Sequence, residues 1–426
     1  MEQSVTVKQQ PSDVELDARY ADIFERIAQG AAQREQKREL PHEAVRWLKE
    51  SGFTSLRIPQ EYGGGGASLP QVFRQLTRLA RADSNLPQIL RAHFRFVETR
   101  LEGDEALRQY WLPRLAAGET VGSAVSERRG STENTVLLTP DPSGSGYRLN
   151  GEKFYSTGTL YAEWVNVAAH DDQSDVYVMV RTDAAGVTRI DDWDGFGQRM
   201  TGSGTTRFDN VHVPEEGIIS RYHAARTRSG TTLQAAFVQT VHLATLAGIA
   251  AAVQEDGIAY VQRKTRTFGV PGHSEPRNNP LVQRVIGRIS SLAWSAQTLV
   301  QAVATSLDRL QQAKAAAAAR PEDYVTTDIQ VFQAQQIVLQ QVLEACSLVF
   351  EVGGATATSE GLRLDRHWRN ARVLASHNPA AQREASIGRY LLNGTPPDER
   401  SSVAYGTDTA PQGTAPAPAA ASNQAA

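Results

Sequence analysis

A stretch between Val121 and Pro214 follows a different hydrophobic pattern from the rest of the chain. Apolar residues there alternate with polar ones, as in Val176, Val178 and Val180, and Gly, Asp and Asn separate the runs. The other alternating runs contain Tyr147, Leu149, Phe208, Val211 and Val213. A period of two predicts half-buried antiparallel strands, whereas the flanking sequence has the three-to-four-residue spacing of helices. We therefore expect an α+β fold with a small antiparallel β domain inserted between two helical domains.

These patterns divide the chain into four parts. We expect an N-terminal helical domain at residues 13–120, the β domain at 121–230 and a C-terminal four-helix bundle at 231–396. The bundle is predicted from three long apolar periodicities and a shorter element around residues 386–392, with Gly353-Gly354 ending the third helix. Residues 397–426 are mainly Ala, Pro, Gly, Ser and Thr. They offer little to bury, and we expect a disordered tail.

Composition excludes several classes of protein. The 426 residues carry a net charge of −3 without a basic block, which argues against nucleic acid and anionic membranes as partners. We find no apolar run approaching the roughly 20 residues of a membrane span, and residues 1–17 lack the apolar region of a signal peptide. The single Cys346 can form no intramolecular disulfide, and the nine histidines are scattered, so we expect no metal site. A cytoplasmic location follows as an expectation.

Five short motifs occur in a characteristic order along the chain. They are Pro59-x-x-Tyr62-Gly63-Gly64, Asn150-Gly151-x-Lys153-x-Tyr155, Phe208-Asp209-x-Val211-x-Val213-Pro214, Arg266-Thr267-Phe268-Gly269 with Gln283, and Gly353-Gly354. Over residues 14–396 this order resembles the acyl-CoA dehydrogenase superfamily. The resemblance implies a helical domain, a β domain that carries a flavin, and a four-helix bundle.

The residues expected of a dehydrogenase base are absent from two stretches. Dehydrogenases of this superfamily use a Glu to remove an α-proton. The two corresponding stretches, residues 238–243 and 374–379, contain histidines but no carboxylate, and Glu384 lies outside the second one. Further motifs resemble instead the reduced-flavin monooxygenase branch, typified by dibenzothiophene monooxygenase and the sulfur-acquisition oxidoreductases. They are Tyr155-Ser156-Thr157-Gly158, residues 192–199, residues 201–205, Arg369-Asn370-Ala371-Arg372, Ser376-His377-Asn378-Pro379 and Tyr390-x-Leu392-Asn393-Gly394.

The resemblance to this branch implies a set of site residues. His93, His377 and Thr157 are the candidate catalytic residues. An imidazole titrates near working pH and can protonate or hold a flavin C4a-hydroperoxide. Thr157 aligns with a Ser of that branch whose hydroxyl faces the edge of the flavin. The candidate cofactor-binding residues are Ser126, Tyr155, Ser156, Thr157, Trp193, Ser203, Arg266, Phe268, Gln283, Gly353 and Gly354. Arg266 suits a phosphate group. In the superfamily the equivalent Arg often reaches the flavin of a neighbouring subunit, which implies a homotetramer.

Several of these residues have simpler structural explanations. His93 could satisfy a core contact, and His242 and His367 are expected to be structural. Thr157 could offer only its backbone to a flavin, and Trp193 could be a packed core aromatic. Arg266 could neutralise the C-terminal end of a helix, and Gly353-Gly354 could be a helix C-cap.

Three functional hypotheses remain open from the sequence. The first is a two-component monooxygenase that uses O2 and reduced FMN, or less favourably FAD, supplied by a separate flavin reductase. Its substrate would be small and fairly apolar, such as an organosulfur or heteroaromatic compound. The second is an FAD-dependent acyl-CoA dehydrogenase or oxidase, and the third a non-catalytic subunit with a flavin fold. Flavin retention on purification distinguishes the first two.

Overall fold

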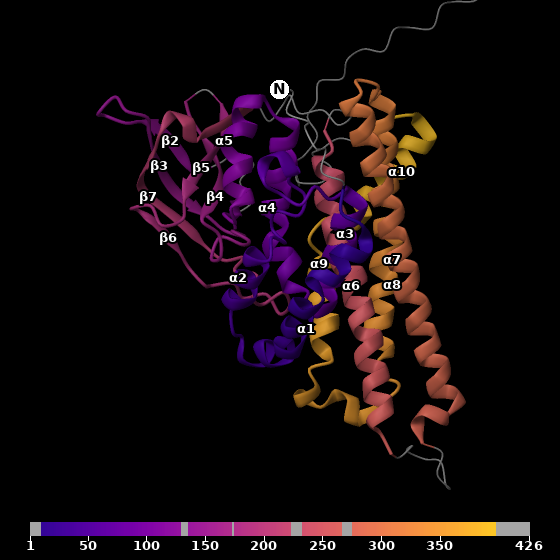
Figure 1. Cartoon of the computed structure of the whole chain (residues 1–426). Coiled ribbons are helices and arrows are strands. Elements are labelled where there is room, and N and C mark those ends of the chain that lie inside the picture. The colour runs from indigo at the N-terminus through magenta and orange to yellow at the C-terminus, as the bar shows by residue number, and fades with distance from the viewer. Residues whose placement is uncertain (1–9, 129–134, 173, 223–231, 266–274, 398–426) are drawn as a thin grey trace, which may run out of the picture.

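The computed structural model describes residues 10–128, 135–172, 174–222, 232–265 and 275–397. It contains an N-terminal group of helices, a β-sheet and a C-terminal group of long helices (Figure 1). The N-terminal helices lie between the sheet and the long helices (Figure 1). The three-part α+β architecture expected from the sequence is confirmed. The tail predicted at residues 397–426 lies, apart from Pro397, outside the described residues.

The N-terminal group contains two helices with capping boxes and a glycine-rich loop before the second of them. Its helices are α1 (Asp13–Lys37), α2 (His42–Glu50), α3 (Leu69–Ala82), α4 (Asn85–Glu102) and α5 (Glu105–Ala116), with a short 3-10 helix η1 (Gln60–Tyr62). Ser12 and Ser68 cap α1 and α3 through reciprocal bonds with the third residue of each helix. Pro41 is the N-cap of α2 and separates it from α1. The loop before α3 needs its glycines for close approach, since a Cβ at Gly64 would lie 2.2 Å from the Ile58 carbonyl oxygen.

Within the described residues the sheet has eight strands. They are β1 (Val121–Ala124), β2 (Leu137–Pro140), β3 (Tyr147–Lys153), β4 (Trp164–His170), β5 (Asp175–Arg181), β6 (Val187–Arg189), β7 (Thr206–Val213) and β8 (Ile218–Tyr222). The order is β6-β7-β3-β2-β4-β5-β8, with β1 on β4. Most strand pairs are antiparallel. The exceptions are β1, which runs parallel to β4, and β2, which pairs with β4 in parallel at one residue pair. The expectation of an antiparallel domain therefore needs this correction. The alternating residues Leu149, Val176 and Val178 are buried, as the period of two predicts.

The C-terminal group is a bundle with one more helix than expected. It comprises α6 (Gln234–Arg263), α7 (Pro280–Ala315), α8 (Pro321–Leu348), α9 (Asp365–Ala375) and α10 (Ala380–Asn393). The short helix α9 was not expected, and together with α10 it packs on α6 and α8 in place of a single fourth helix. Gly353-Gly354 does not end α8, which stops at Leu348 with Val349 as its C-cap; the pair instead begins the 3-10 helix η4 (Gly354–Thr358).

Helix α6 is the central element of the bundle. Its length and composition would allow it to cross a membrane, contrary to our expectation that no segment would. However, 89% of its most apolar window is buried inside the protein, as in the core helix of a soluble protein. It packs against α3, α4, α7 and α8, so it joins the N-terminal helices to the bundle.

Candidate functional site

The turn after β3 is held in place from two sides. Tyr155 has a positive φ of 60°, and its side chain is 47% exposed. The next residues bond to a neighbouring loop, Ser156 N to the Gly204 carbonyl (3.0 Å) and Gly158 N to the Thr201 carbonyl (3.1 Å). On the other side a Cβ at Gly158 would lie 2.4 Å from the Ile89 carbonyl oxygen of α4, so only glycine fits there. The turn therefore presents Tyr155 outward while α4 and the 198–205 loop fix its base.

A chain of buried hydroxyl groups runs beneath this turn. Thr157 Oγ1 lies 2.8 Å from Ser203 Oγ, which lies 2.7 Å from Thr201 Oγ1. Thr201 donates to the Gln198 carbonyl at 2.9 Å, and a carbonyl can only accept. Because each hydroxyl carries one proton, Ser203 donates to Thr201, and Thr157 donates to Ser203 at 2.8 Å rather than to the Tyr155 carbonyl, which lies farther away at 3.3 Å. The Thr157 oxygen is thereby oriented as an acceptor for a further hydrogen bond.

Aromatic side chains line the outer side of the turn. The Tyr155 and Trp193 ring centroids are 6.0 Å apart, and Phe154 lies 6.4 Å from Trp193. Trp193 is half-buried and donates Nε1–H to the Gln198 carbonyl at 3.0 Å. Ser126 is exposed, and its carbonyl accepts the Phe154 N–H at 3.1 Å. Sequence-predicted residues from three segments therefore meet at this surface.

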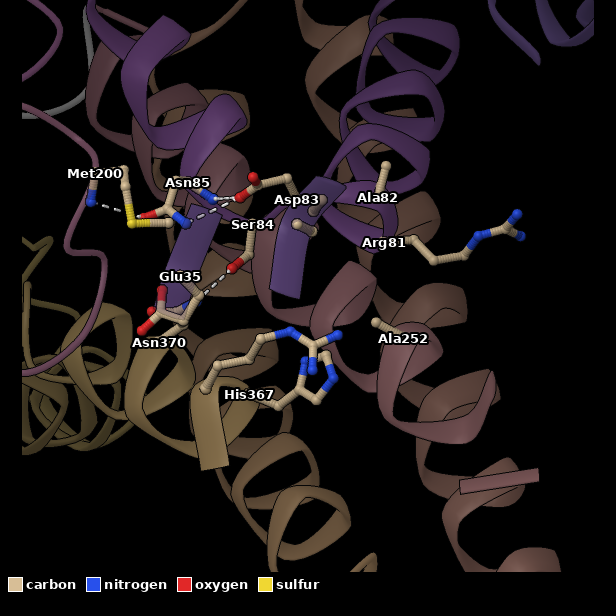
Figure 2. Close-up of a pocket in the computed structure, with 13 residues that line it drawn as sticks. Glu35, Arg81, Ala82, Asp83, Ser84, Asn85, Met200, Ala252, His367 and Asn370 are labelled. Carbon is tan, nitrogen blue, oxygen red and sulfur yellow. Dashed lines mark hydrogen bonds between the residues drawn. The ribbon is translucent and has the colours of Figure 1, made fainter. Parts of the chain in front are cut away.

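The 198–205 loop is itself anchored where the three parts of the fold meet. Gln198 N donates to Asn370 Oδ1 of α9 at 2.6 Å, and Asn370 Nδ2 donates to Ser84 Oγ at 3.0 Å. Figure 2 shows Ser84 and Asn370 pointing toward each other, with Met200 N directed at Asn85. The pocket in this view has room for about 20 Å³, close to one water molecule, and none of the predicted site residues lines it. The junction is therefore a support for the loop rather than a binding site.

His93 is fully buried on α4. Its Nε2 lies 2.8 Å from the Thr54 carbonyl, so Nε2 carries the proton and Nδ1 has a free lone pair. Within the described residues Nδ1 is a buried nitrogen without a hydrogen-bond partner. Burial lowers the pKa of His93 to about 4. The ring is therefore a neutral acceptor at neutral pH, and the core contact considered from the sequence also exists, through Nε2.

His377 lies beside a histidine that sequence reasoning had treated as structural. The His242 and His377 rings meet edge to face, with centroids 4.3 Å apart and planes at 83°. His242 is 1% exposed and neither ring nitrogen has a partner in the described structure, whereas His377 is accessible to solvent. The surrounding protein and the Arg91 guanidinium lower the pKa of His377 to about 3. Among the described contacts none joins His377 to His93, the other histidine predicted at the site.

The other predicted residues lie elsewhere or are not described. Gln283 is exposed and donates to the Arg277 carbonyl at 3.0 Å, and the Gly353 carbonyl accepts from Lys264 at 2.9 Å. Gly354 has a positive φ of 56°. Arg266 and Phe268 fall outside the described residues. Their proposed role at a flavin phosphate therefore stays a prediction. His367, expected to be structural, bonds Asp256 at 2.8 Å.

Sequence reasoning missed His242 and two arginines close to it. The His242 and His377 rings are in contact, and Arg383 bonds the same Gln239 oxygen as Asn378, the neighbour of His377. Arg91 and Arg383 also lower the pKa values of both histidines, so we treat the four side chains as one cluster. His242 stands in the segment where a dehydrogenase carboxylate was sought, and that position was the available signal. Arg91 and Arg383 belong to ordinary helical patterns, and only the packing of α4, α6 and α10 brings them together.

The arrangement can hold a planar, partly apolar ring with polar edges. Tyr155 and Trp193 supply apolar walls, the Thr157 oxygen supplies an acceptor, and His93 supplies a buried nitrogen without a partner. These features fit an isoalloxazine ring. Within the described residues no group of three or more His, Cys, Asp or Glu side chains is placed to hold a metal ion.

Comparison with known proteins agrees with this geometry. The chain matches family models for the acyl-CoA dehydrogenase N-terminal domain (residues 17–119), middle domain (122–211) and C-terminal domain (240–382). Dibenzothiophene monooxygenase of Rhodococcus erythropolis is 28% identical over 364 residues, covering 82% of this chain and 86% of the relative.

Two further relatives cover most of the chain. SfnC of Pseudomonas putida, a probable FMNH2-dependent monooxygenase, is 27% identical over 378 residues, covering 87% of this chain and 93% of SfnC. The crystal structure of TdsC from Paenibacillus sp. A11-2 with FMN and indole has a TM-score of 0.80 at 27% identity, covering 89% of this chain and 98% of TdsC. The chain therefore belongs to the acyl-CoA dehydrogenase superfamily, in the branch that contains the flavin-dependent monooxygenases.

Proposed function

We propose that the protein is a flavin-dependent monooxygenase that uses reduced FMN and O2 to oxygenate a small organic substrate. The observation that carries the proposal is the contact between His242 and His377, which come from the two stretches that the resemblance matches to the carboxylate base of a dehydrogenase. The lowered pKa values of these two imidazoles make them weak bases for removing an α-proton, but as neutral rings they can exchange hydrogen bonds with oxygen species. The bound FMN of TdsC and the FMNH2 dependence in the name of SfnC support this cofactor.

The chain's own residues have separate tasks in this proposal. Reduced FMN supplies the electrons that activate O2. Tyr155 and Trp193 orient the flavin ring and exclude water from it, and the Thr157 oxygen accepts a hydrogen bond from its edge. His93 accepts a proton or hydrogen bond at Nδ1 while Thr54 fixes the ring through Nε2. His377 holds its neutral ring toward the accessible side of the site.

We further propose that a separate reductase supplies the reduced flavin and that the protein is a homotetramer. The FMNH2 dependence in the name of SfnC supports the first part, because reduced flavin has to be generated elsewhere. The resemblance of Arg266 to an arginine that reaches a neighbouring subunit supports the second. Light scattering of the purified protein measures the oligomeric state directly.

The test follows oxygen from O2 into product. The purified protein should be nearly colourless and, with FMN, NADH and a flavin reductase, should incorporate one ¹⁸O atom from ¹⁸O2 into an aryl sulfide, indole or an organosulfinate. His377→Ala should consume reduced flavin while releasing more H2O2 and less product. Gln109→Ala, on the exposed side of α5, is the matched control and should behave as the wild type. A yellow protein whose tightly bound FAD is bleached by an acyl-CoA would contradict the proposal and favour a dehydrogenase.

A further inference from the structure

Four nitrogen-rich side chains from four segments meet beside the proposed flavin site. They are Arg91 of α4, His242 of α6, His377 after α9 and Arg383 of α10. His242 and Arg383 are each 1% exposed, and His377 is accessible. We call this set the basic cluster. His377, which packs on His242, is the member of the cluster that the proposed function places at the accessible side of the flavin site, so the cluster lies beside that site.

The positive charge of the basic cluster is poorly compensated inside the protein. Arg383 donates to the side-chain oxygens of Gln239 and Gln335, and its guanidinium lies 4.6 Å from the Phe332 ring. These hydrogen-bond partners are neutral. Burial lowers the pKa of Arg383, and the carboxylate of Asp328 in α8 raises it electrostatically.

Arg91 has no hydrogen bond or ion pair with another described residue, and its Nε is buried without a partner. Arg91 is only partly buried, but its buried Nε has no acceptor and its charge has no carboxylate partner in the described structure, and a bound anion would supply both.

His242 indicates where that anion would bind. Both of its ring nitrogens are buried and have no partner among the described residues. Burial and the neighbouring His377 and arginines lower its pKa well below the usual value. A neutral imidazole carries one N–H donor, so His242 can donate to an anion beside Arg91 without adding charge. Asn378 and Gln239, joined by a 2.6 Å hydrogen bond, hold the adjacent polar wall in place.

We propose that the basic cluster binds an oxyanionic group of the substrate, such as a carboxylate, sulfinate or sulfonate, next to the site of oxygenation. This inference rests on the proposed function and narrows its substrate class, which the sequence had suggested to be fairly apolar. Guanidinium groups bind such oxyanions through paired N–H donors. The apolar part of the substrate would then extend toward Tyr155 and Trp193.

The first experiment measures binding to the flavin-free protein by calorimetry, with benzenesulfinate and its neutral analogue methyl phenyl sulfoxide as probes. The wild type should bind benzenesulfinate at least tenfold more tightly, because only the anion engages the arginines. Arg91→Gln should reduce this preference about tenfold or more, since it removes the unpaired charge. Arg81→Gln is the matched control, because Arg81 is half exposed and pairs with Glu255 at 3.2 Å, away from the cluster. Equal binding of the two probes by the wild type would overturn the proposal.

A second experiment tests whether the basic cluster binds the substrate anion or the phosphate group of the flavin. Binding of FMN and of riboflavin, which lacks the phosphate, is measured for the wild type and Arg91→Gln. The proposal expects both flavins to bind the variant as tightly as the wild type. Weaker binding of FMN but not riboflavin would assign the cluster to the flavin phosphate and overturn it. Oxygenation of neutral sulfides without anion preference would also overturn it while leaving the monooxygenase function intact. Anion binding without any oxygenation would instead contradict the proposed function alone.

Discussion

The imidazole ring of His377 packs edge to face on that of His242, with the centroids 4.3 Å apart. The two residues come from the middle of α6 and from the turn between α9 and α10. His242 is enclosed and His377 is accessible, so the outer ring covers part of the inner one. Burial lowers the pKa of His242, and the surrounding protein and the Arg91 guanidinium lower the pKa of His377, so each ring is unprotonated at neutral pH. The pair is thus a neutral, layered contact at the edge of the proposed site.

This layering predicts an order of chemical modification. Diethyl pyrocarbonate reacts with unprotonated, accessible imidazoles, so at pH 7 His377 should react at least about tenfold faster than His242, whose reaction requires local opening. His377→Ala should speed up modification of His242, because the covering ring is gone. Peptide mass spectrometry measures both rates. His170, whose side chain is 46% exposed, is the control and should react equally in both proteins. Equal rates for His242 in the two proteins would contradict the layering.

Burial of His93 predicts an acid-sensitive fold. Its pKa is about 4 when folded and about 6.5 when unfolded, so below pH 6.5 the unfolded chain binds a proton that the folded protein excludes. The free energy of unfolding should therefore fall as the pH drops from 7 to 5, by about 2 kcal/mol from this residue. His93→Gln, which keeps an N–H donor for the Thr54 carbonyl, should remove that part of the fall.

Denaturant titrations at pH 7 and pH 5 measure this difference. His170→Gln, at an exposed position on β4, is the matched control and should keep the wild-type pH dependence. If His93→Gln and the wild type lose the same free energy between the two pH values, the neutral buried state of His93 is wrong.

The direction of the hydroxyl chain predicts that mutations at Thr157 and Ser203 lower, to different degrees, the amount of product formed per reduced flavin. Thr157→Val removes the acceptor oxygen and one hydrogen bond, at a cost of about 1 kcal/mol in stability. Product formed per reduced flavin should fall about tenfold or more, with a matching rise in H2O2. Ser203→Ala keeps the Thr157 oxygen but frees its proton, so its effect should be smaller. Thr139→Val, at an exposed site on β2, is the control. A Thr157→Val protein with wild-type coupling would show that only the backbone matters there.

The sequence predicted the large elements because their patterns are local. The alternation at Val176 and Val178 and the long periodicity of α7 each reflect one buried face, and that face is set by residues close together in the chain. Helix α9 was missed because its eleven residues are mostly polar, and only His367, Asn370, Ala371, Leu374 and Ala375 are buried. The parallel β1–β4 pair was missed because β1 has only four residues and its partner lies beyond β3.

The site was predicted in part for the same reason. Tyr155, Thr157 and Ser203 lie in short motifs, and the structure brings them together through hydrogen bonds between two loops. The basic cluster could not be predicted, because Arg91 and Arg383 sit in helical patterns typical of solvent-facing residues. Their burial depends on how α4 and α10 pack against α6 and α8, which no local spacing specifies.

The buried ion pair between Lys153 of β3 and Glu127 predicts that removing one charge destabilises the protein more than removing both. Lys153 is fully buried, and its Nζ lies 2.6 Å from Glu127 Oε1, next to Ser126. Glu127→Gln removes a carboxylate from beside the buried ammonium and should cost about 3 kcal/mol of unfolding free energy. The double variant Glu127→Leu with Lys153→Met should lose less, because no charge remains buried. Glu152→Gln is the matched control on the same strand, since its pair with Arg207 is half exposed and should contribute under about 1 kcal/mol. Urea unfolding of the four proteins measures these values, and a Glu127→Gln loss as small as that of Glu152→Gln would contradict the burial of the charge.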